Sequence, residues 1–400
     1  MKIIFSLLFL LIISAPVHSQ PVVDYLLKAR AVTEQGKPEI AISLLNQAIS
    51  EIKDSRLNIE RAEANFMKGD ITGAITDYND ANKLSPSVGD YGLARIYAIK
   101  GDAKTSLYHL ELNMKSAFRK SEKEIMLDPA FAAIENKPEW RQFWQKDRYT
   151  AVEKGIASIE YSLSLHKADE SVVLLSELKK EYTGNDELNY ADALIKNETG
   201  KYSEAVSILS RLVQQFPENE KYLRLLAKTQ VDGSNPAGAS VTYSRLIESG
   251  IADAGLFVLR AECYMKTGEN EKALADIEKC LIYYPSDKLA LSMAGKAESA
   301  AGDNLSALKY FSENLRLHPN DSECYSDRAN SYFISRSWEW AIKDYTMSLD
   351  LNPGNSDVWL SKGISLLNSG KTEDACHDFR KSFSMGNKRA SEYISRNCIK

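Results

Sequence analysis

The residues best suited to nucleophilic chemistry or metal binding are few and dispersed. The chain has five histidines and five cysteines among 400 residues. His377 directly follows Cys376, but consecutive helical residues point in different directions, so these two cannot bind a metal ion unaided. The sequence also lacks the HExxH, GxSxG, phosphate-loop and CxxC motifs. We therefore expect no enzymatic activity, no metal and no cofactor. The other histidines are His18, His109, His166 and His318.

The charged residues favour neither carboxylate catalysis nor nucleic-acid binding. They make up 26% of the chain and give a formal net charge of −5, without a strongly basic face. Acidic residues fall mostly on predicted outward-facing helix positions, where contact with solvent is the usual explanation for a charged side chain. Catalysis by a carboxylate pair would need a pocket that raises one pKa, and nothing in the sequence indicates one. We expect a protein partner and no nucleic acid.

The first nineteen residues resemble an export signal. Lys2 supplies a positive charge, Ile3 to Ile13 form an apolar run, and small residues around Ser19 offer a cleavage site. The alternative, a membrane anchor, is less favoured because the run is short and no later stretch has spanning length. The cleavage region has no cysteine for a lipid anchor. We expect an exported protein, periplasmic or secreted, that begins at Gln20 and associates with the cell envelope at most peripherally.

In the second half of the chain, the sequence pattern recurs every 34 residues. The structural elements that this pattern encodes would have to position any functional site. Small residues recur at positions eight and twenty of each repeat, and bulky ones at position twenty-four. This pattern predicts pairs of antiparallel helices whose closest approach admits only small side chains. The repeats begin at Asp186, Glu220, Ala254, Lys288, Ser322 and Ser356. Position eight is Ala193, Ala227, Ala261, Gly295, Ala329 and Gly363; position twenty is Ala205, Ala239, Ala273, Ala307, Ala341 and Ala375; position twenty-four is Leu209, Tyr243, Ile277, Phe311, Tyr345 and Phe379.

Glycine and proline punctuate the same register. Gly200, Gly268, Gly302 and Gly370 fall at the predicted turn inside a repeat, where positive φ ends the first helix. Prolines fall where the second helix must stop. These prolines are Pro217, Pro285, Pro319 and Pro353.

These columns resemble the tetratricopeptide repeat. The closest match runs from Tyr325 to Pro353. The resemblance implies an all-α protein, an α-solenoid in which helix pairs stack into a superhelix. The matching residues in that segment are Arg328, Ala329, Tyr332, Trp338, Ala341, Tyr345 and Pro353.

Looser copies of the pattern suggest two arrays. We expect a signal peptide at 1–19, about three repeats at 20–114, an aromatic-rich helical segment at 115–150, about seven repeats at 151–387, and a capping helix at 388–400. In the aromatic segment, Trp140, Phe143 and Trp144 share one helical face. Either this face covers the end of the first array, or it forms an aromatic peptide-binding patch.

The odd cysteine count leaves at least one thiol free or paired between chains. Cys376 lies about 12 Å before the turn near Met385, and Cys398 about 16–18 Å after it, so antiparallel helices would place the two sulfurs roughly level. We expect a disulfide between them, with two free thiols as the alternative. Cys280 falls in a core column, and Cys263 and Cys324 have no obvious partner.

The resemblance places the partner-binding groove on the first helix of each repeat, at positions two, five, nine, twelve and thirteen. We expect a non-enzymatic scaffold or adaptor that binds a peptide or partner helix there, with a carboxylate near the cations. The apolar end of the groove could instead be covered by the capping helix. An alternative function is a glycan- or ligand-binding module of an envelope or secretion complex that stacks on Trp140 and Trp144. The residues that clamp chaperone tails in this family are absent. The predicted groove residues are Tyr190, Asn197, Arg224, Lys228, Met265, Lys296, Asn330, Phe333, Leu360 and Ile364.

Overall fold

The computed structural model describes residues 19–398, and every regular element in that range is helical. The predicted signal peptide lies outside the described residues, apart from Ser19. Among the described residues, no helix combines the length and the apolar character needed to cross a membrane. The described chain forms two compact units. Unit 1 comprises the chain up to Leu225 together with Leu246–Asp253; unit 2 comprises Leu226–Arg245 and the chain from Ala254 onward.

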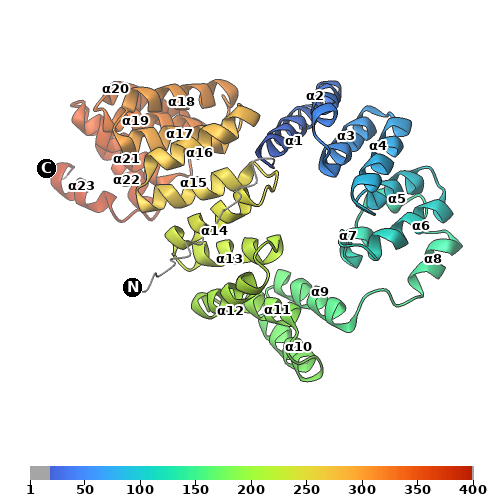
Figure 1. Cartoon of the computed structure of the whole chain (residues 1–400). Helices are drawn as coiled ribbons and strands as arrows, with labels where there is room; N and C mark the ends of the chain where they lie inside the picture. The colour runs from blue at the N-terminus through green and yellow to red at the C-terminus, as the bar shows by residue number, and fades with distance from the viewer. Residues whose placement is uncertain (1–18, 399–400) are drawn as a thin grey trace, which may run out of the picture. The chain divides into compact units, whose positions relative to one another are not determined.

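Unit 1 is built from consecutive helices that pair with their neighbours (Figure 1). Its helices are α1 (Ser19–Glu34), α2 (Pro38–Glu51), α3 (Ser55–Lys68), α4 (Ile71–Leu84), α5 (Asp90–Ile99), α6 (Ala103–Met114), α7 (Glu122–Met126), the 3₁₀ turn η1 (Pro129–Phe131), α8 (Pro138–Trp144), α9 (Ala151–Ser164), α10 (Ala168–Glu181), α11 (Asp186–Glu198) and α12 (Tyr202–Gln215). Helices α13 (Glu220–Asp232) and α14 (Pro236–Glu248) are divided between the units.

Unit 2 continues the pairing as four repeats and a last short helix (Figure 1). Three of its four first helices begin with a side-chain cap; for example, Asp287 accepts from the backbone N–H of Ala290, and Asp321 from that of Glu323. The helices are α15 (Gly255–Thr267), α16 (Asn270–Tyr283), α17 (Lys288–Ala301), α18 (Asn304–Leu317), α19 (Ser322–Ile334), α20 (Trp338–Leu351), α21 (Ser356–Asn368), α22 (Thr372–Ser384) and α23 (Ala390–Asn397).

The columns of small residues lie where the helices of a pair meet, as predicted. The alanines at positions eight and twenty are 0% exposed. At Gly295 a Cβ would lie 2.5 Å from Cε1 of Phe311, and at Gly363 it would lie 2.6 Å from Cε1 of Phe379. These glycines therefore leave room for the bulky residue at position twenty-four.

The predicted breaks are also confirmed. Gly268 ends α15 with φ of 79°, and Gly302 ends α17 with φ of 91°. Gly200 and Gly370 likewise have positive φ. Helices α12, α16, α18 and α20 each end two residues before their proline.

The aromatic face of segment 115–150 is buried. Trp140 and Phe143 are each 7% exposed and pack in one core cluster with residues of α5 and α6, such as Ala94 and Leu110. Trp144 is partly buried against the same cluster, and its ring contacts those of Trp140 and Phe143. The face therefore covers the last helix pair of the first array. It is neither an open peptide-binding patch nor a platform on which a glycan could stack, because the rings already pack against protein.

Helix α23 closes unit 2 and is tied to it covalently. A disulfide joins Cys376 of α22 to Cys398, with 5.5 Å between the Cα atoms. Tyr393 stacks on Phe379 at 5.0 Å between ring centroids. The other three cysteines, Cys263, Cys280 and Cys324, are free and buried.

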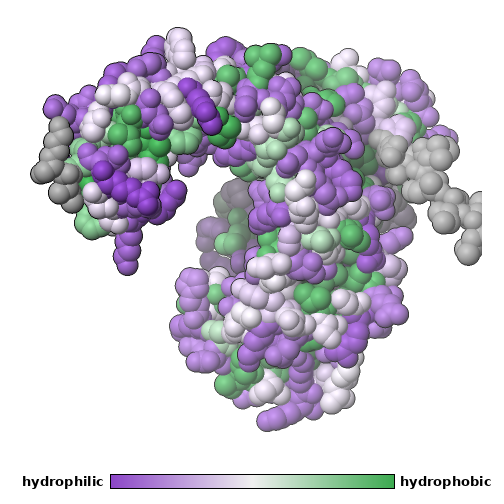
Figure 2. All heavy atoms as spheres, turned by 90° about the vertical axis from the view of Figure 1, so that its left-hand side faces the viewer, coloured by the Kyte–Doolittle hydropathy of each residue, from purple (hydrophilic) through white to green (hydrophobic). Residues whose placement is uncertain are grey.

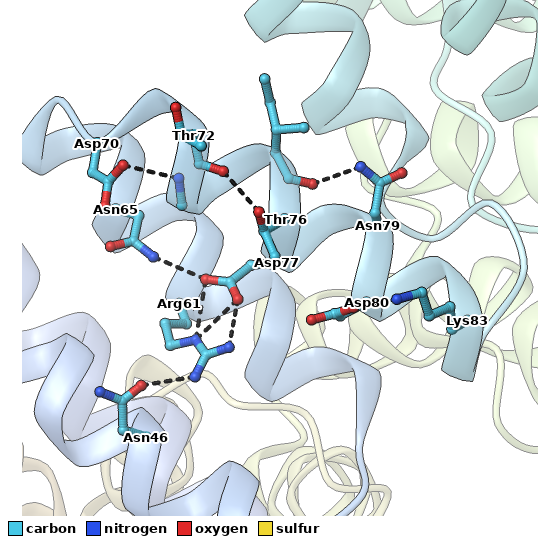
Figure 3. Close-up of polar contacts among 12 residues, drawn as sticks. Asn46, Arg61, Asn65, Asp70, Thr72, Thr76, Asp77, Asn79, Asp80 and Lys83 are labelled. Atoms are coloured by element: carbon cyan, nitrogen blue, oxygen red, sulfur yellow. Dashed lines mark hydrogen bonds and ion pairs between the residues drawn. The ribbon is translucent and has the colours of Figure 1, made fainter.

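A buried ion pair ties the two helices of several repeats together. In Figure 3, Arg61 donates to both carboxylate oxygens of Asp77, and Asn46 and Asn65 complete the network. The Asp77 side chain is only 4% exposed. Equivalent pairs recur between positions seven and twenty-three, two columns whose pairing was not predicted from the sequence. They are Arg260–Asp276, Arg328–Asp344 and Lys362–Asp378.

Candidate partner-binding site

The predicted groove residues are divided between the two units. Tyr190, Asn197 and Arg224 belong to unit 1. The remaining seven belong to unit 2, six of them on the first helices α15, α17, α19 and α21. Each unit therefore has to be considered by itself. The seven are Lys228, Met265, Lys296, Asn330, Phe333, Leu360 and Ile364.

Two of the three unit 1 members offer little free surface. Tyr190 is 7% exposed and Asn197 is 4% exposed. The ring of Tyr190 packs against Tyr222 at 5.6 Å and lies 4.0 Å from the ammonium of Lys221. These contacts hold Tyr190 within the repeat stack and not on an open face.

The predicted cations already have carboxylate partners. Arg224 binds Glu220 at 2.7 Å and Asp253 at 2.8 Å. Lys228 binds Asp232 at 2.8 Å, and Lys296 binds Asp327 at 3.1 Å. A carboxylate on a partner would have to compete with these internal ones. The attraction is therefore weaker than the positive charges alone suggest.

The apolar end of the predicted groove is partly covered. Leu360 is 2% exposed and belongs to a cluster that also contains Ala390 and Tyr393 of α23. Ile364 packs against the same cluster. Phe333 is half-buried and contacts Trp338 at 5.3 Å. The capping helix thus packs against Leu360 and Ile364, two of the three apolar residues that were expected to face a partner.

A hollow of about 260 Å³ remains on the first helices of unit 2, between α17 and α19. Lys296 and Asn330, two of the predicted residues, line it and are exposed. Phe311 of α18 also lines it. On its α19 side lies Ile334, which is 58% exposed and which the sequence analysis did not select. The structure thus brings together Lys296 and Asn330 around an apolar depression.

The amide of Asn330 is held in a fixed orientation. Its Oδ1 accepts a hydrogen bond of 2.7 Å from the hydroxyl of Tyr345. Burial raises the pKa of Tyr345, so this hydroxyl keeps its proton and remains a donor. The described residues accept no hydrogen bond from Asn330 Nδ2, which leaves that group able to donate to a ligand.

A larger cavity of about 620 Å³ lies in unit 1 and is lined by residues 119–124, by α9 and by Tyr149, Glu187 and Lys221. Its lining combines basic and acidic side chains in equal number, and several of them are already paired. Charge therefore gives no preference for an anion or a cation. Among the described residues, no group of three or more His, Cys, Asp or Glu is placed to hold a metal. The ion pairs of this cavity are Arg119–Glu153, Lys120–Glu124 and Lys221–Glu187.

Surface hydrophobicity alone would not have located a binding site. On the face shown in Figure 2, hydrophobic and hydrophilic side chains are interspersed. The register of the repeats, and not a patch, distinguishes the first-helix surface.

Comparison with known families matches the tetratricopeptide repeat at residues 188–219 and 254–287, the repeats that begin near Asp186 and at Ala254. The chain is a tetratricopeptide repeat protein. A search of curated protein sequences finds no match.

One solved structure supports the fold of this tetratricopeptide repeat protein, and others are similar over part of it. A tetratricopeptide repeat protein from Parabacteroides merdae is 19% identical and has a TM-score of 0.51, covering 62% of this chain and 99% of that one. MamA is 17% identical with a TM-score of 0.38, covering 42% of this chain and 97% of that one. A protein from Thermus thermophilus, TTC0263, is 18% identical with a TM-score of 0.36, covering 46% of this chain and 100% of that one. The repeat fold supports a general role as a scaffold for protein–protein interaction.

Proposed function

We propose that this tetratricopeptide repeat protein is an exported, non-enzymatic adaptor that binds an extended peptide segment of a partner protein on the first helices of unit 2. The observation that carries the proposal is the hollow between α17 and α19. It combines an apolar depression with the free amide donor of Asn330 on the helix surface that the repeat register presents. A peptide offers the matching groups, because it has apolar side chains and backbone carbonyls.

Two features support export. The apolar run from Ile3 to Ile13, preceded by Lys2, has the composition of a cleavable signal. The disulfide between Cys376 and Cys398 is of a kind that persists in oxidising compartments. The partner would then lie in the periplasm, in the envelope or outside the cell.

Peptide binding is tested with a random twelve-residue peptide library displayed on phage and selected on the full chain. Selected peptides are synthesised with a fluorescent label, and their Kd is measured by anisotropy. We expect Asn330→Arg, which replaces the free amide with a bulky cation, to abolish binding. Lys309→Glu, on the exposed side of α18, serves as the control and is expected to leave Kd unchanged. Peptides that bind both variants equally well would contradict binding at this surface.

Export is tested by fusing residues 1–30 to alkaline phosphatase, which becomes active only when exported and oxidised. We expect activity in the periplasmic or secreted fraction and a mature product that begins at Gln20. Replacing Leu8 and Leu11 with Arg should interrupt the apolar run and abolish activity. An active fusion in which the leader remains intact would argue against a cleaved signal.

A further inference from the structure

The hollow in unit 2 exists because α17 has two small residues where the other first helices have larger ones. Ser299 and Ala300 occupy positions twelve and thirteen of their repeat. The neighbouring helices carry Met265 and Lys266 before them, and Phe333 and Ile334 after them. In a common register, the two missing side chains leave a depression over Phe311. The residues at the same two positions in the other three repeats are Asn197 and Glu198, Val231 and Asp232, and Leu367 and Asn368.

The surroundings of the depression are mainly apolar. The ring of Phe311, the side chain of Ile334 and the methyl of Ala300 line it. The hydroxyl oxygens of Ser299 and Ser331 are buried and form no hydrogen bond with the described residues, so neither is exposed to a ligand. The charges of Lys296 and Asp327 neutralise one another at 3.1 Å. A charged group entering the depression would lose hydration without gaining an unpaired counter-charge.

The size of the depression argues against a complete small-molecule ligand. Its volume of about 260 Å³ lies below the roughly 300–1,000 Å³ typical of small-molecule sites. It is nevertheless many times the roughly 30 Å³ that one water molecule occupies in the liquid. The hollow is therefore large enough to admit a branched aliphatic side chain and small for a complete small-molecule ligand.

We propose that this hollow is a specificity pocket for one aliphatic side chain, of valine to leucine size, of the bound peptide. The proposal rests on the proposed function and specifies which chemistry the partner must present. Asn330 lies one helical turn from Ile334 on the same face of α19. Its Nδ2 group donates to a backbone carbonyl next to the aliphatic residue. The pocket thus recognises the side chain, and the amide holds the backbone extended beside it.

The test is a substitution that fills the pocket and leaves the buried core residues unchanged. Ala300 is exposed, so Ala300→Leu places a side chain in the hollow itself. Lys266→Leu is the matched control, because Lys266 is exposed at the same position of the preceding repeat, outside the hollow. The library-selected peptides are measured against the full chain and both variants, with helical content checked by circular dichroism.

We expect the selected peptides to share one aliphatic position. Replacing that residue with alanine should weaken binding about tenfold or more. Ala300→Leu should abolish binding of the parent peptides, and Lys266→Leu should leave Kd within about twofold.

The remaining outcomes separate the two proposals. If peptides bind and are lost on Asn330→Arg, but Ala300→Leu binds them as tightly as the parent chain does, the pocket is overturned while the peptide-binding function stands. If the peptides share a charged or aromatic position instead, the pocket is also overturned. If the library yields no peptide that Asn330→Arg disrupts, the proposed function fails, and the pocket with it.

Discussion

At the scale of single residues, one missing methyl group decides how two helices pack. Position eight is alanine in four of the six repeats that share one register and glycine at Gly295 and Gly363. In both glycine repeats a phenylalanine ring from the second helix occupies the space where a Cβ would stand. The aromatic ring and the glycine therefore require one another.

We expect Gly363→Ala to destabilise the protein, although glycine to alanine in a helix normally stabilises by about 1 kcal/mol. The new Cβ would lie 2.6 Å from the ring of Phe379, which is 0% exposed and has little room to move. Overpacking of this kind costs about 1–3 kcal/mol, measured as the free energy of unfolding of unit 2 in urea. The double variant Gly363→Ala/Phe379→Leu should recover part of the loss. A stabilised single variant would contradict the packing.

The thiols give a second prediction at this scale. Burial raises the pKa of Cys280 and of Cys324 to about 11, and it also raises the pKa of Cys263. Because only the thiolate reacts, iodoacetamide at pH 8 should modify no cysteine of the native chain. Unfolding without reductant should expose three thiols, and reduction should raise the count to five. Five reactive thiols after unfolding without reductant would mean that the disulfide is absent.

The same thiols predict how the stability of the folded protein changes at alkaline pH. Their folded pKa lies above the unfolded value near 9, so the folded state binds protons more tightly. This contribution to stability is complete below about pH 9 and is lost as the pH rises toward 11. Urea midpoints should therefore fall over that range, and Cys280→Ala/Cys324→Ala should flatten the decline.

At the scale of elements, periodicity predicted the helices of the regular repeats and their ends. Turn glycines and the prolines after second helices are local signals, so their consequences could be derived from the sequence. The ion pair between Arg260 and Asp276 could have been found in the columns at positions seven and twenty-three, but it recurs in only some repeats. Which groove residues are buried could not be derived, because the burial of Tyr190 and Leu360 depends on contacts with other elements.

The hollow between α17 and α19 also could not be predicted from the sequence. Ser299 and Ala300 are visible in the sequence as small residues, but small residues also mark helix contacts, as at position eight. Only the structure shows that Ala300 is exposed and that this pair leaves a depression. The ion pair between Lys296 and Asp327 could not be predicted from the sequence either. The two residues lie on different helices, so their separation along the chain does not give the distance between their side chains.

The link between α22 and α23 yields a prediction at the element scale. Cys398→Ser removes a disulfide that closes a loop of 22 residues, a restraint worth about 3 kcal/mol in the chain-entropy description. Helix α23 has only eight residues, too few to be stable in isolation. Amide hydrogen exchange should accelerate across 390–397 and remain unchanged in α15 to α18. Unchanged exchange in α23 would mean that packing of Tyr393 on Phe379 is sufficient to hold it.

At the scale of the whole molecule, the contacts of a repeat array join mainly neighbours, so damage should stay local. The five tryptophans report on this separately, because Trp140 and Trp144 belong to unit 1 and the other three to unit 2. One reporter chain carries Trp338→Phe, Trp340→Phe and Trp359→Phe, and the other carries Trp140→Phe and Trp144→Phe. Gly363→Ala added to each should lower the urea midpoint of the unit 2 reporter much more than that of unit 1. Equal shifts would show that the chain unfolds as one cooperative body.

The depression depends on the two small residues Ser299 and Ala300 and does not follow from the repeat fold alone. Every first helix of unit 2 presents the same two positions, so the feature is portable. Exchanging Phe333 and Ile334 for serine and alanine would remove the corresponding side chains one repeat further along, and it would also remove Ile334 from the wall of the original depression. Filling Ala300 would close the original. On such a surface, the residues at these two positions could be changed in one repeat at a time, while the helix pairs that carry them stay the same.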